Sequence, residues 1–542
     1  MRPLAYTFAL GSLLAGLASA SDPPTVSVKN GSYYGVYQET YAQDLFLGMP
    51  YAQPPVGDLR FRNPESLNST WTDAKNATEY SPECYGYGSD QWVLGNVISE
   101  DCLTINVVRP NDISKGSEPP VAVWIHGGGF TEGGSRDPRY NQSYIIKEAT
   151  DAGIPFIGVS INYRLQAFGF LWGSAVQEAG VSNLGLKDQH LALHWVQENI
   201  AAFGGDPTKV TIWGESAGAM SVGYRLLAYD GRDDGLYRAA IMESGAPAKV
   251  PSTYLNTTEW DVYYNNITSA ANCSSAADTL DCLRQVPIDT LSSIFNSSVA
   301  SSASYRPIVD GDFLTDVGPA LLMEGKFVHV PILHGANNDE GSAFGAGGAT
   351  VNTTEEFVSF LIDVMGETEE TAAILTEADS GYGVMYKRAA AYGGDVIMHA
   401  PRRYLSEIWA ANGLPSYSYI FNVLAAGLDE YIGATHFQEV AFVFYNLEGD
   451  GYNNSVATDP FLNKPDSYKQ LARVMTRMWA SFIVHENPNE NGVTALEWPV
   501  YTSDNAQNIV FDANVTEFAY IAPDTYRAEG IAYLTSLYNA TA

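Results

Sequence analysis

The stretch VTIWGESAG, residues 210–218, places a serine between two glycines where an apolar run changes into a helical pattern. The run 210–213 has the length and β-branched composition of a buried strand, and the apolar spacing of 217–227 predicts a helix. The flanking glycines leave room for a tight strand-to-helix turn that lifts the oxygen of Ser216 above the sheet. The free N–H groups at the start of the helix would face developing negative charge. The sequence therefore predicts an activated nucleophile at Ser216.

Short apolar runs and helical patterns alternate along the rest of the chain. The other predicted strands are residues 121–125, 156–161, 239–242, 328–333 and 417–423, and the clearest further helical patterns are 186–200 and 467–483. This alternation is typical of an α/β protein with a mostly parallel sheet and helices on both faces. No repeat or long linker divides the chain, so we expect one catalytic domain with long loop and helix insertions.

A glycine triplet follows the first of these predicted strands. In WIHGGGF, residues 124–130, three glycines let backbone amides turn toward one point. Because such amides stabilise an oxyanion, we expect the N–H groups of Gly128, Gly129 and Ala217 to form an oxyanion hole beside Ser216. A flexible glycine loop without this role is the alternative.

Longer motifs give the chain a family resemblance. FGGDP at 203–207 leading to Ser216, together with EDCLTINV at 100–107, closely resembles the two signatures of the type-B carboxylesterase/lipase family. That family includes cholinesterases, fungal lipases and sterol esterases. The resemblance extends over most of the chain through GMPYAQPPVG at 48–57, NYR at 162–164, NLG at 183–185 and DQ at 188–189. It implies an α/β-hydrolase fold and an ester hydrolase with a Ser-Glu-His triad that needs no cofactor.

The expected base is the histidine of a polar turn. In the α/β-hydrolase fold the nucleophile is followed by the acid and then by the histidine, which leaves His399, His436 and His485 as candidates. His399 sits in an apolar helical run and His485 follows a long helical pattern, so we expect structural roles for both. His436 ends the turn GATH, which matches the family's Gly-x-x-His motif, and it is the predicted base.

Two adjacent carboxylates are candidates for the acid. Asp339 and Glu340 both follow the predicted strand 328–333, and sites in open α/β sheets lie at the carboxyl ends of strands. The resemblance to the family's Asp-Glu-Gly motif selects Glu340, and Asp339 stays the alternative. Glu215 and Ser244 also match family positions and are expected to support the triad by hydrogen bonds, with ordinary packing as the alternative.

The N-terminus and the glycosylation sequons indicate export. Residues 1–20 have the basic start, short apolar run and small final residues of a signal peptide, so residues 21–542 would be the secreted mature chain. The apolar run is too short for a stable membrane anchor. Twelve Asn-x-Ser/Thr sequons predict N-linked glycans on some of them. The formal net charge of −33 repels phosphate backbones and excludes nucleic-acid binding.

The four cysteines fall into two close pairs, Cys84 with Cys102 and Cys273 with Cys282. Three pairings are formally possible, but the two others would join distant segments, so we expect two local disulfides in an oxidising compartment. No CxxC motif or His/Cys cluster indicates a metal site.

The loop that the first disulfide would close bears on the substrate. In the enzymes that the chain resembles, the loop corresponding to residues 84–102 forms a flap at the mouth of the gorge. The flap of long-chain fungal lipases is considerably longer, which favours an esterase here over a lipase or sterol esterase. Trp92 has the spacing of the choline-binding tryptophan of cholinesterases, but Ala343 replaces a further aromatic of that pattern, so we expect Trp92 to be an apolar wall. Phe130 and Phe344 are the other candidate pocket residues.

Two other classes of function compete with a serine esterase. The resembled family includes extracellular adhesion proteins that have lost the nucleophile, and a protease could use the same triad. The presence of Ser216, Glu340 and His436 favours an ester hydrolase that acts through an acyl-enzyme. The sequence leaves the acyl chain length, the alcohol and the oligomeric state open.

Overall fold

The computed structural model describes most of the chain after the predicted signal peptide. The described residues are 22–541 without 90–92, 114–115, 249–256, 301–304, 345–350, 352, 365–367, 370–371, 373–384 and 456. The predicted signal peptide, residues 1–20, and the candidate pocket residue Trp92 therefore lie outside the described residues, and both stay predictions.

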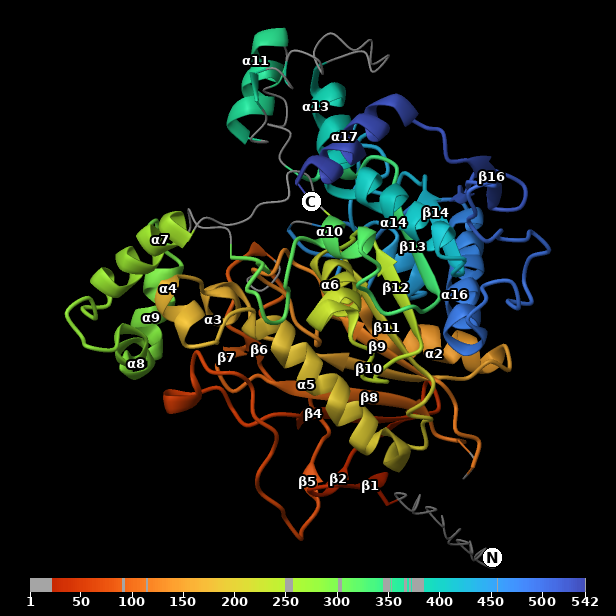
Figure 1. Cartoon of the computed structure of the whole chain (residues 1–542). Helices are drawn as coiled ribbons and strands as arrows, with labels where there is room; N and C mark the ends of the chain where they lie inside the picture. Colours follow the sequence, from red (N-terminus) through yellow and green to blue (C-terminus); the bar gives the residue numbers. More distant parts are fainter. Residues whose placement is uncertain are drawn as a thin grey trace, which may run out of the picture.

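An eleven-stranded sheet forms the centre of the described chain (Figure 1). In chain order its strands are β3 (Val36–Gln38), β4 (Gln43–Pro50), β8 (Thr104–Pro110), β9 (Val121–Ile125), β10 (Ile157–Ile161), β11 (Val210–Glu215), β12 (Ala239–Glu243), β13 (Ile332–Asn337), β14 (Ser416–Phe421), β15 (Gln507–Phe511) and β16 (Ala519–Pro523). Their spatial order is β16-β15-β14-β13-β12-β11-β9-β10-β8-β4-β3. Neighbours from β10 to β15 are parallel, and the strands at both edges are antiparallel. The predicted mostly parallel sheet is confirmed.

Helices cover both faces of this sheet (Figure 1). The first face carries α5 (Leu184–Asn199), α6 (Ala217–Gly231) and α14 (Ala400–Ala411), and the second carries α2 (Gln142–Asp151), α15 (Val440–Val443) and α16 (Asp466–His485). Side chains alternate between the faces, so Val123 of β9 joins the first apolar core and Trp124 joins the second. Both cores hold the central strands rigidly beneath the site.

Shorter elements surround these layers. The remaining helices are η1 (Gly57–Leu59), η2 (Pro138–Tyr140), α3 (Gln166–Phe170), α4 (Ser174–Glu178), η3 (Ile200–Phe203), α7 (Thr257–Ala270), α8 (Thr279–Gln285), α9 (Ile288–Phe295), α10 (Gly318–Met323), η4 (Glu340–Ser342), α11 (Thr354–Ser359), η6 (Phe360–Val364), α13 (Met385–Gly394), η7 (Asp395–His399) and α17 (Ala528–Thr541). Two small sheets hold β1 (Thr25–Val28), β2 (Gly31–Tyr34) and β5 (Lys75–Asn76), and β6 (Glu83–Cys84) and β7 (Ile98–Ser99). No helix in the described ranges has the length and apolar character needed to cross a membrane.

One predicted strand is displaced toward the site. The prediction placed it at 328–333, whereas β13 begins at Ile332 and ends at Asn337. The carbonyl of Pro331 accepts the N–H of Ala240 at 3.1 Å. Proline has no N–H, so Pro331 cannot donate a hydrogen bond to the neighbouring strand. The strand therefore starts after the proline and delivers the following turn to the edge of the sheet.

Both predicted disulfides are present. Cys84 is bonded to Cys102 and Cys273 to Cys282. The first disulfide anchors β6 to the segment before β8, so both ends of the loop between its cysteines are held against the sheet.

Candidate active site

The carboxyl ends of neighbouring parallel strands gather the predicted site residues at one edge of the sheet. The glycine triplet follows β9, Ser216 follows β11, Ser244 follows β12, and Glu340 lies in the turn after β13. Because parallel strands end at the same edge, residues far apart in the sequence meet there.

Ser216 stands in a strained turn between β11 and α6. Its φ and ψ of 56° and −123° are values that residues with a side chain rarely adopt. The two flanking glycines are required by close packing. A Cβ on Gly214 would lie 2.5 Å from the carbonyl carbon of Gly218, and one on Gly218 would lie 2.0 Å from the carbonyl oxygen of Ile125. The turn thus raises the Ser216 side chain above the sheet at the start of α6.

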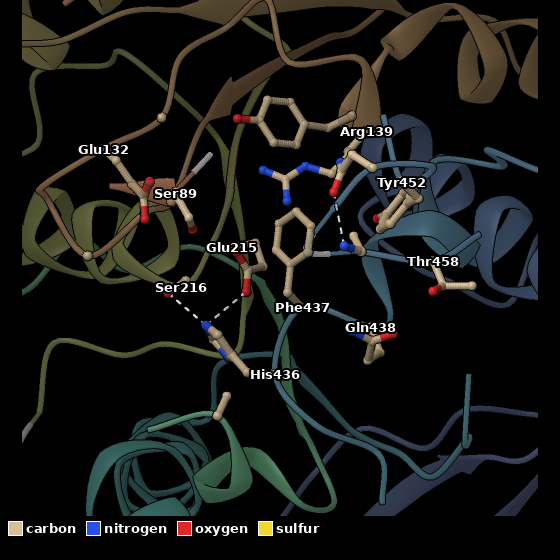
Figure 2. A pocket seen from close by; sticks show the side chains of 18 of the residues that line it. Ser89, Glu132, Arg139, Glu215, Ser216, His436, Phe437, Gln438, Tyr452 and Thr458 are labelled. Carbon is tan, nitrogen blue, oxygen red and sulfur yellow. Dashed lines mark hydrogen bonds and ion pairs between the residues drawn. The ribbon is translucent and has the colours of Figure 1, made fainter. Parts of the chain in front are cut away.

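Two hydrogen bonds join Ser216, His436 and Glu340. Ser216 Oγ donates to His436 Nε2 at 2.8 Å (Figure 2), and His436 Nδ1 donates to Glu340 Oε2 at 2.6 Å. The second oxygen of Glu340 accepts the backbone N–H of Asn337 at 2.7 Å. Since Glu340 holds the proton of Nδ1, the neutral form of His436, which prevails above its pKa, presents the lone pair of Nε2 to the serine. This arrangement can remove the proton of Ser216.

The alternative acid and bases lie elsewhere. Asp339 accepts the N–H of Ala434 at 3.0 Å. His399 is buried in η7, and His485 ends α16 with its Nδ1 3.8 Å from Glu490. Within the described part of the chain, the geometry therefore brings Glu340 and His436, and not these alternatives, to Ser216.

The three predicted oxyanion donors lie on two segments next to Ser216: Gly128 and Gly129 follow β9, and Ala217 begins α6. Gly128 and Gly129 have φ of +94° and +63°. A Cβ on Gly128 would lie 2.3 Å from the carbonyl oxygen of Glu132, which makes glycine necessary there. Among the described residues, the amides of Gly128, Gly129 and Ala217 have no hydrogen-bond acceptor. These N–H groups are available to an incoming oxygen.

Comparison with known proteins places this geometry in a family. The model of the Carboxylesterase family matches residues 22–527. This chain belongs to the carboxylesterase family. It therefore has the α/β-hydrolase fold that the sequence predicted, and the enzyme is a carboxylic-ester hydrolase.

Similar proteins come from fungi. Lipase 2 of Diutina rugosa is 34% identical over 576 aligned residues, which cover 97% of this chain and 98% of that protein. A secreted triacylglycerol lipase of Gibberella zeae is 33% identical, with 88% and 84% covered. Secreted lipase 1 of Botryotinia fuckeliana is 31% identical, with 95% and 93% covered. The likeness thus spans nearly the whole enzyme.

Further buried glutamates surround the pair formed by His436 and Glu340. Glu215 Oε1 lies 3.2 Å from His436 Nε2 (Figure 2). Glu439 accepts hydrogen bonds from Ser244 Oγ at 3.1 Å and from Asn337 Nδ2 at 2.5 Å. The hydroxyl of Ser244 also lies within hydrogen-bonding reach of Glu340. Ser244 is therefore placed between two carboxyl groups rather than against the histidine.

Glu243 forms a deeper layer of the same cluster. Its Oε1 accepts the indole N–H groups of Trp213 and Trp479 at 2.5 and 2.6 Å. The side chain is fully buried between the core tryptophans. Two neutral donors on one oxygen satisfy a protonated carboxyl group as well as an ionised one.

The pKa values of these glutamates separate them by role. Burial raises the pKa of Glu215 and Glu243 well above the ordinary 4.5, and burial together with the charge of Glu340 raises the pKa of Glu439 to about 7. Burial would also raise the pKa of Glu340, but the charge and hydrogen bond of His436 hold it below 4.5. The shifts are thus opposite in sign: the pKa of Glu340 is lowered, whereas those of Glu215, Glu243 and Glu439 are raised.

The pKa of His436 is raised to about 9. Burial alone would lower it, but ionised Glu215 and Glu340 and the hydrogen bond to Glu340 raise it. The carboxylates of Glu215 and Glu340 therefore both favour the protonated form of His436.

A cavity of about 850 Å³ opens beside Ser216 and His436. The candidate pocket residue Phe344 lies along this cavity, and its ring centroid lies 4.6 Å from that of His436. The wall across from the nucleophile is lined by Arg139, Phe437, Gln438, Tyr452 and Thr458 (Figure 2). The cavity therefore combines aromatic and polar walls.

Phe130 does not belong to this wall. Only 4% of the residue is exposed, and its ring packs edge-on against Phe170 at a centroid distance of 5.1 Å. Its carbonyl accepts the N–H of Gln166 at 2.8 Å. Phe130 therefore fixes the glycine loop from behind, because its left-handed φ of 63° turns the side chain toward α3.

Sequence reasoning missed Glu439, Glu243 and Phe437. Glu439 lies three residues after the predicted base and directly before α15, and Glu243 ends an apolar strand. A carboxyl group in an apolar segment needs hydrogen-bond partners when it is buried. The apolar sequence around Glu439 and Glu243 was therefore a signal that could have revealed both residues. Phe437 had none, because its significance lies in a backbone angle. Within the described ranges, no group of three or more His, Cys, Asp or Glu side chains could hold a metal ion.

Proposed function

We propose that this chain is a secreted serine carboxylic-ester hydrolase in which Ser216, His436 and Glu340 act as nucleophile, base and acid. The observation that carries the proposal is the pair of hydrogen bonds of 2.8 and 2.6 Å that links these side chains beside the cavity. A non-catalytic adhesion protein would have no need for this buried, charge-matched arrangement.

The chemistry follows from the positions of the protons. His436 Nε2 removes the proton of Ser216 while Oγ attacks the ester carbonyl carbon. Glu340 stabilises the resulting imidazolium, which donates its proton to the alcohol oxygen as the C–O bond breaks. The acyl group remains on Ser216. Water, deprotonated by His436, then releases the carboxylic acid and restores the serine.

The backbone amides of Gly128, Gly129 and Ala217 would bind the negative oxygen of both tetrahedral intermediates. Their free N–H groups and the left-handed glycines support this role. Loss of one such donor costs about 3 kcal/mol of transition-state stabilisation in comparable sites. Glu215 and Ser244 would support the triad from beside His436 and between Glu340 and Glu439.

Secretion rests on the predicted signal peptide and on relatives. The similar proteins of Gibberella zeae and Botryotinia fuckeliana are named as secreted. Both disulfides agree with an oxidising compartment. Asn68, Asn76 and Asn453 are exposed members of the predicted sequons and would be available as glycan sites.

Two substrate classes remain for this site. The short loop between Cys84 and Cys102 supports an esterase for small carboxylic esters. The relatives named lipases support long-chain acylglycerols as the second candidate. We favour the broad esterase, and the two candidates differ in acyl chain length and in their response to a lipid interface.

The test uses initial rates of the purified protein on p-nitrophenyl esters from acetyl to palmitoyl, below and above substrate aggregation. Ser216→Ala should abolish turnover. Ser221→Ala is the matched control, because Ser221 lies on the same helix and its Oγ accepts the side-chain N–H of Gln189 at 3.0 Å instead of contacting His436. A preference for short chains would establish the esterase, and a maximum at long chains that rises at the interface would establish the lipase. Wild-type turnover in Ser216→Ala would refute the proposal.

A further inference from the structure

Two turns that carry the proposed acid and base are joined by hydrogen bonds. The acid turn, residues 337–342, contains Glu340, and the base turn, residues 433–436, ends at His436. The side-chain amide of Asn337 donates to the carbonyl of Thr435 at 2.8 Å. Ser342 Oγ and Thr435 Oγ1 are hydrogen-bonded at 2.7 Å. Both bonds hold the residue directly before the base.

Asp339 adds two hydrogen bonds between the same turns. Its backbone N–H donates to the carbonyl of Ala434 at 2.9 Å, and its carboxylate Oδ2 accepts the N–H of Ala434 at 3.0 Å. Both polar backbone groups of Ala434 are therefore bonded to one residue of the acid turn. Only 3% of Ala434 is exposed, so loss of the carboxylate would leave a buried N–H without this acceptor, which is costly.

The base turn is shaped around the carboxylate of Asp339. Gly433 has a φ of 75°, and a Cβ there would lie 2.2 Å from Asp339 Oδ2. Glycine is therefore required for both the conformation and the close approach. Two further groups hold the carboxylate: the side-chain amide of Asn338 donates to Oδ2 at 3.2 Å, and Lys387 Nζ of α13 lies 3.4 Å from Oδ1. The acceptor is thus fixed where the base turn meets it.

The position of His436 depends on the contact between the two turns, because its ring must meet two partners at once. Nδ1 lies 2.6 Å from Glu340 Oε2, and Nε2 lies 2.8 Å from Ser216 Oγ. Glu340 directly follows Asp339, so the hydrogen bonds of Asp339 tie the backbone of the base turn to that of the acid. A misplacement of about 1 Å between reacting groups can lower a rate about 10²-fold.

We propose that Asp339 is a positioning residue for the base: its Oδ2 holds the turn that places His436 between Glu340 and Ser216. The role requires a hydrogen-bond acceptor rather than a charge, because the group that Oδ2 receives is a backbone N–H. Asp339 acts through Ala434 and does not contact the imidazole. This inference rests on the proposed function and adds a residue to the support of the same site.

The test compares Asp339→Ala with Asp339→Asn in steady-state hydrolysis of p-nitrophenyl butyrate. Asparagine keeps an oxygen that can accept the N–H of Ala434, whereas alanine removes it. We expect kcat of Asp339→Ala to fall about 10- to 100-fold with KM unchanged, and Asp339→Asn to keep kcat close to that of the wild type. A wild-type kcat in Asp339→Ala would overturn the inference. Equal losses in both variants would also overturn it, because they would assign the effect to the charge.

A spectroscopic readout separates positioning from a general loss of stability. The proton on His436 Nδ1, in its short hydrogen bond to Glu340, should give a downfield ¹H NMR resonance in the wild type and in Asp339→Asn. In Asp339→Ala we expect this resonance to broaden or to move upfield. An unchanged resonance together with a lowered kcat would contradict the inference, because the base would then still be in place.

Asp206→Ala is the matched control. Asp206 also accepts a backbone N–H, from Thr208 at 2.9 Å, and pairs with Lys209 at 2.8 Å, but it precedes β11 at the opposite edge of the sheet. The control should leave kcat, KM and the downfield resonance unchanged. Losses equal to those of Asp339→Ala would assign the effect to general loosening and overturn the inference.

Two further results keep the inference separate from the proposed function. If Asp339→Ala does not fold, Asp339→Ser, whose hydroxyl oxygen stops short of the position of Oδ2, should have a lower kcat than Asp339→Asn with KM unchanged, and equal kcat values would refute the inference. Hydrolysis that depends on Ser216 and Glu340 but not on Asp339 would refute this inference alone. Failure of the wild type to hydrolyse any ester would instead refute the proposed function.

Discussion

Replacing Glu439 by glutamine should remove a pH-dependent loss of stability. Glu439 is fully buried and accepts hydrogen bonds from Ser244 and Asn337. Glutamine has the same shape, and its oxygen can accept from Asn337 while its amide donates to Ser244. The substitution therefore keeps the hydrogen bonds and removes only the capacity to ionise.

The magnitude follows from the pKa of Glu439, which burial and the charge of Glu340 raise from 4.5 to about 7. A raised pKa means that the folded state binds the proton more tightly than the unfolded state. The resulting stability is fully present below pH 4.5 and is lost as the pH rises through 7. At 1.36 kcal/mol per pKa unit the full loss is about 3 kcal/mol, of which about 2 kcal/mol falls between pH 5.5 and 8.

The assay is urea unfolding of the oxidised protein at pH 5.5 and pH 8. The wild type should lose about 2 kcal/mol more of its unfolding free energy between these pH values than Glu439→Gln does. Glu178→Gln is the control, because Glu178 is exposed at the end of α4 and should behave as the wild type. Equal pH dependence of the wild type and Glu439→Gln would refute the assignment of a raised pKa to Glu439.

Three further predictions concern the triad and its support. Glu340→Gln should lower kcat about 10⁴-fold, because the imidazole of His436 loses its orienting charge. Asp339→Asn should leave kcat close to that of the wild type. Equal losses of kcat in the two variants would show that the acid is misassigned. Gly218→Ala would place a Cβ 2.0 Å from the carbonyl oxygen of Ile125. It should therefore lower the free energy of unfolding by about 1–3 kcal/mol and lower kcat. An unchanged melting temperature would contradict this close contact. Burial raises the pKa of Glu243 well above 4.5, so Glu243→Gln, which keeps the shape of the protonated carboxyl group, should keep activity and be no less stable than the wild type at pH 5.5; a large loss of stability in urea at this pH would contradict the raised pKa.

The chemistry-bearing turns could be predicted from the sequence because their requirements are local. The glycines around Ser216 are fixed by close contacts within one strand-turn-helix unit and the neighbouring strand β9. The distinction between Glu340 and Asp339 was less accessible, since both follow the same strand. It came from a family motif, and the structure places the side chain of Glu340, not that of Asp339, against His436.

Other features depend on tertiary packing that no local pattern encodes. The sequence alone does not show that β13 begins after Pro331, because the boundary depends on which residues hydrogen-bond to the neighbouring strands. The sequence makes Phe130 a candidate pocket residue, but its ring packs against Phe170 and its backbone has a left-handed φ of 63°. The same conformation at Phe437 has the opposite result and turns a ring toward the cavity. The direction of a side chain after a left-handed residue therefore depends on neighbours far away in the sequence.

Covalent labelling with a fluorophosphonate, followed by peptide mass mapping, tests most directly whether Ser216 is an activated nucleophile. The account predicts one phosphonyl group on the peptide that contains Ser216, formed more slowly below the pKa of His436 because the protonated imidazole cannot accept the serine proton. Labelling should disappear in Ser216→Ala and fall steeply in Glu340→Gln. An unlabelled wild type, or a label on another serine, would contradict the central claim.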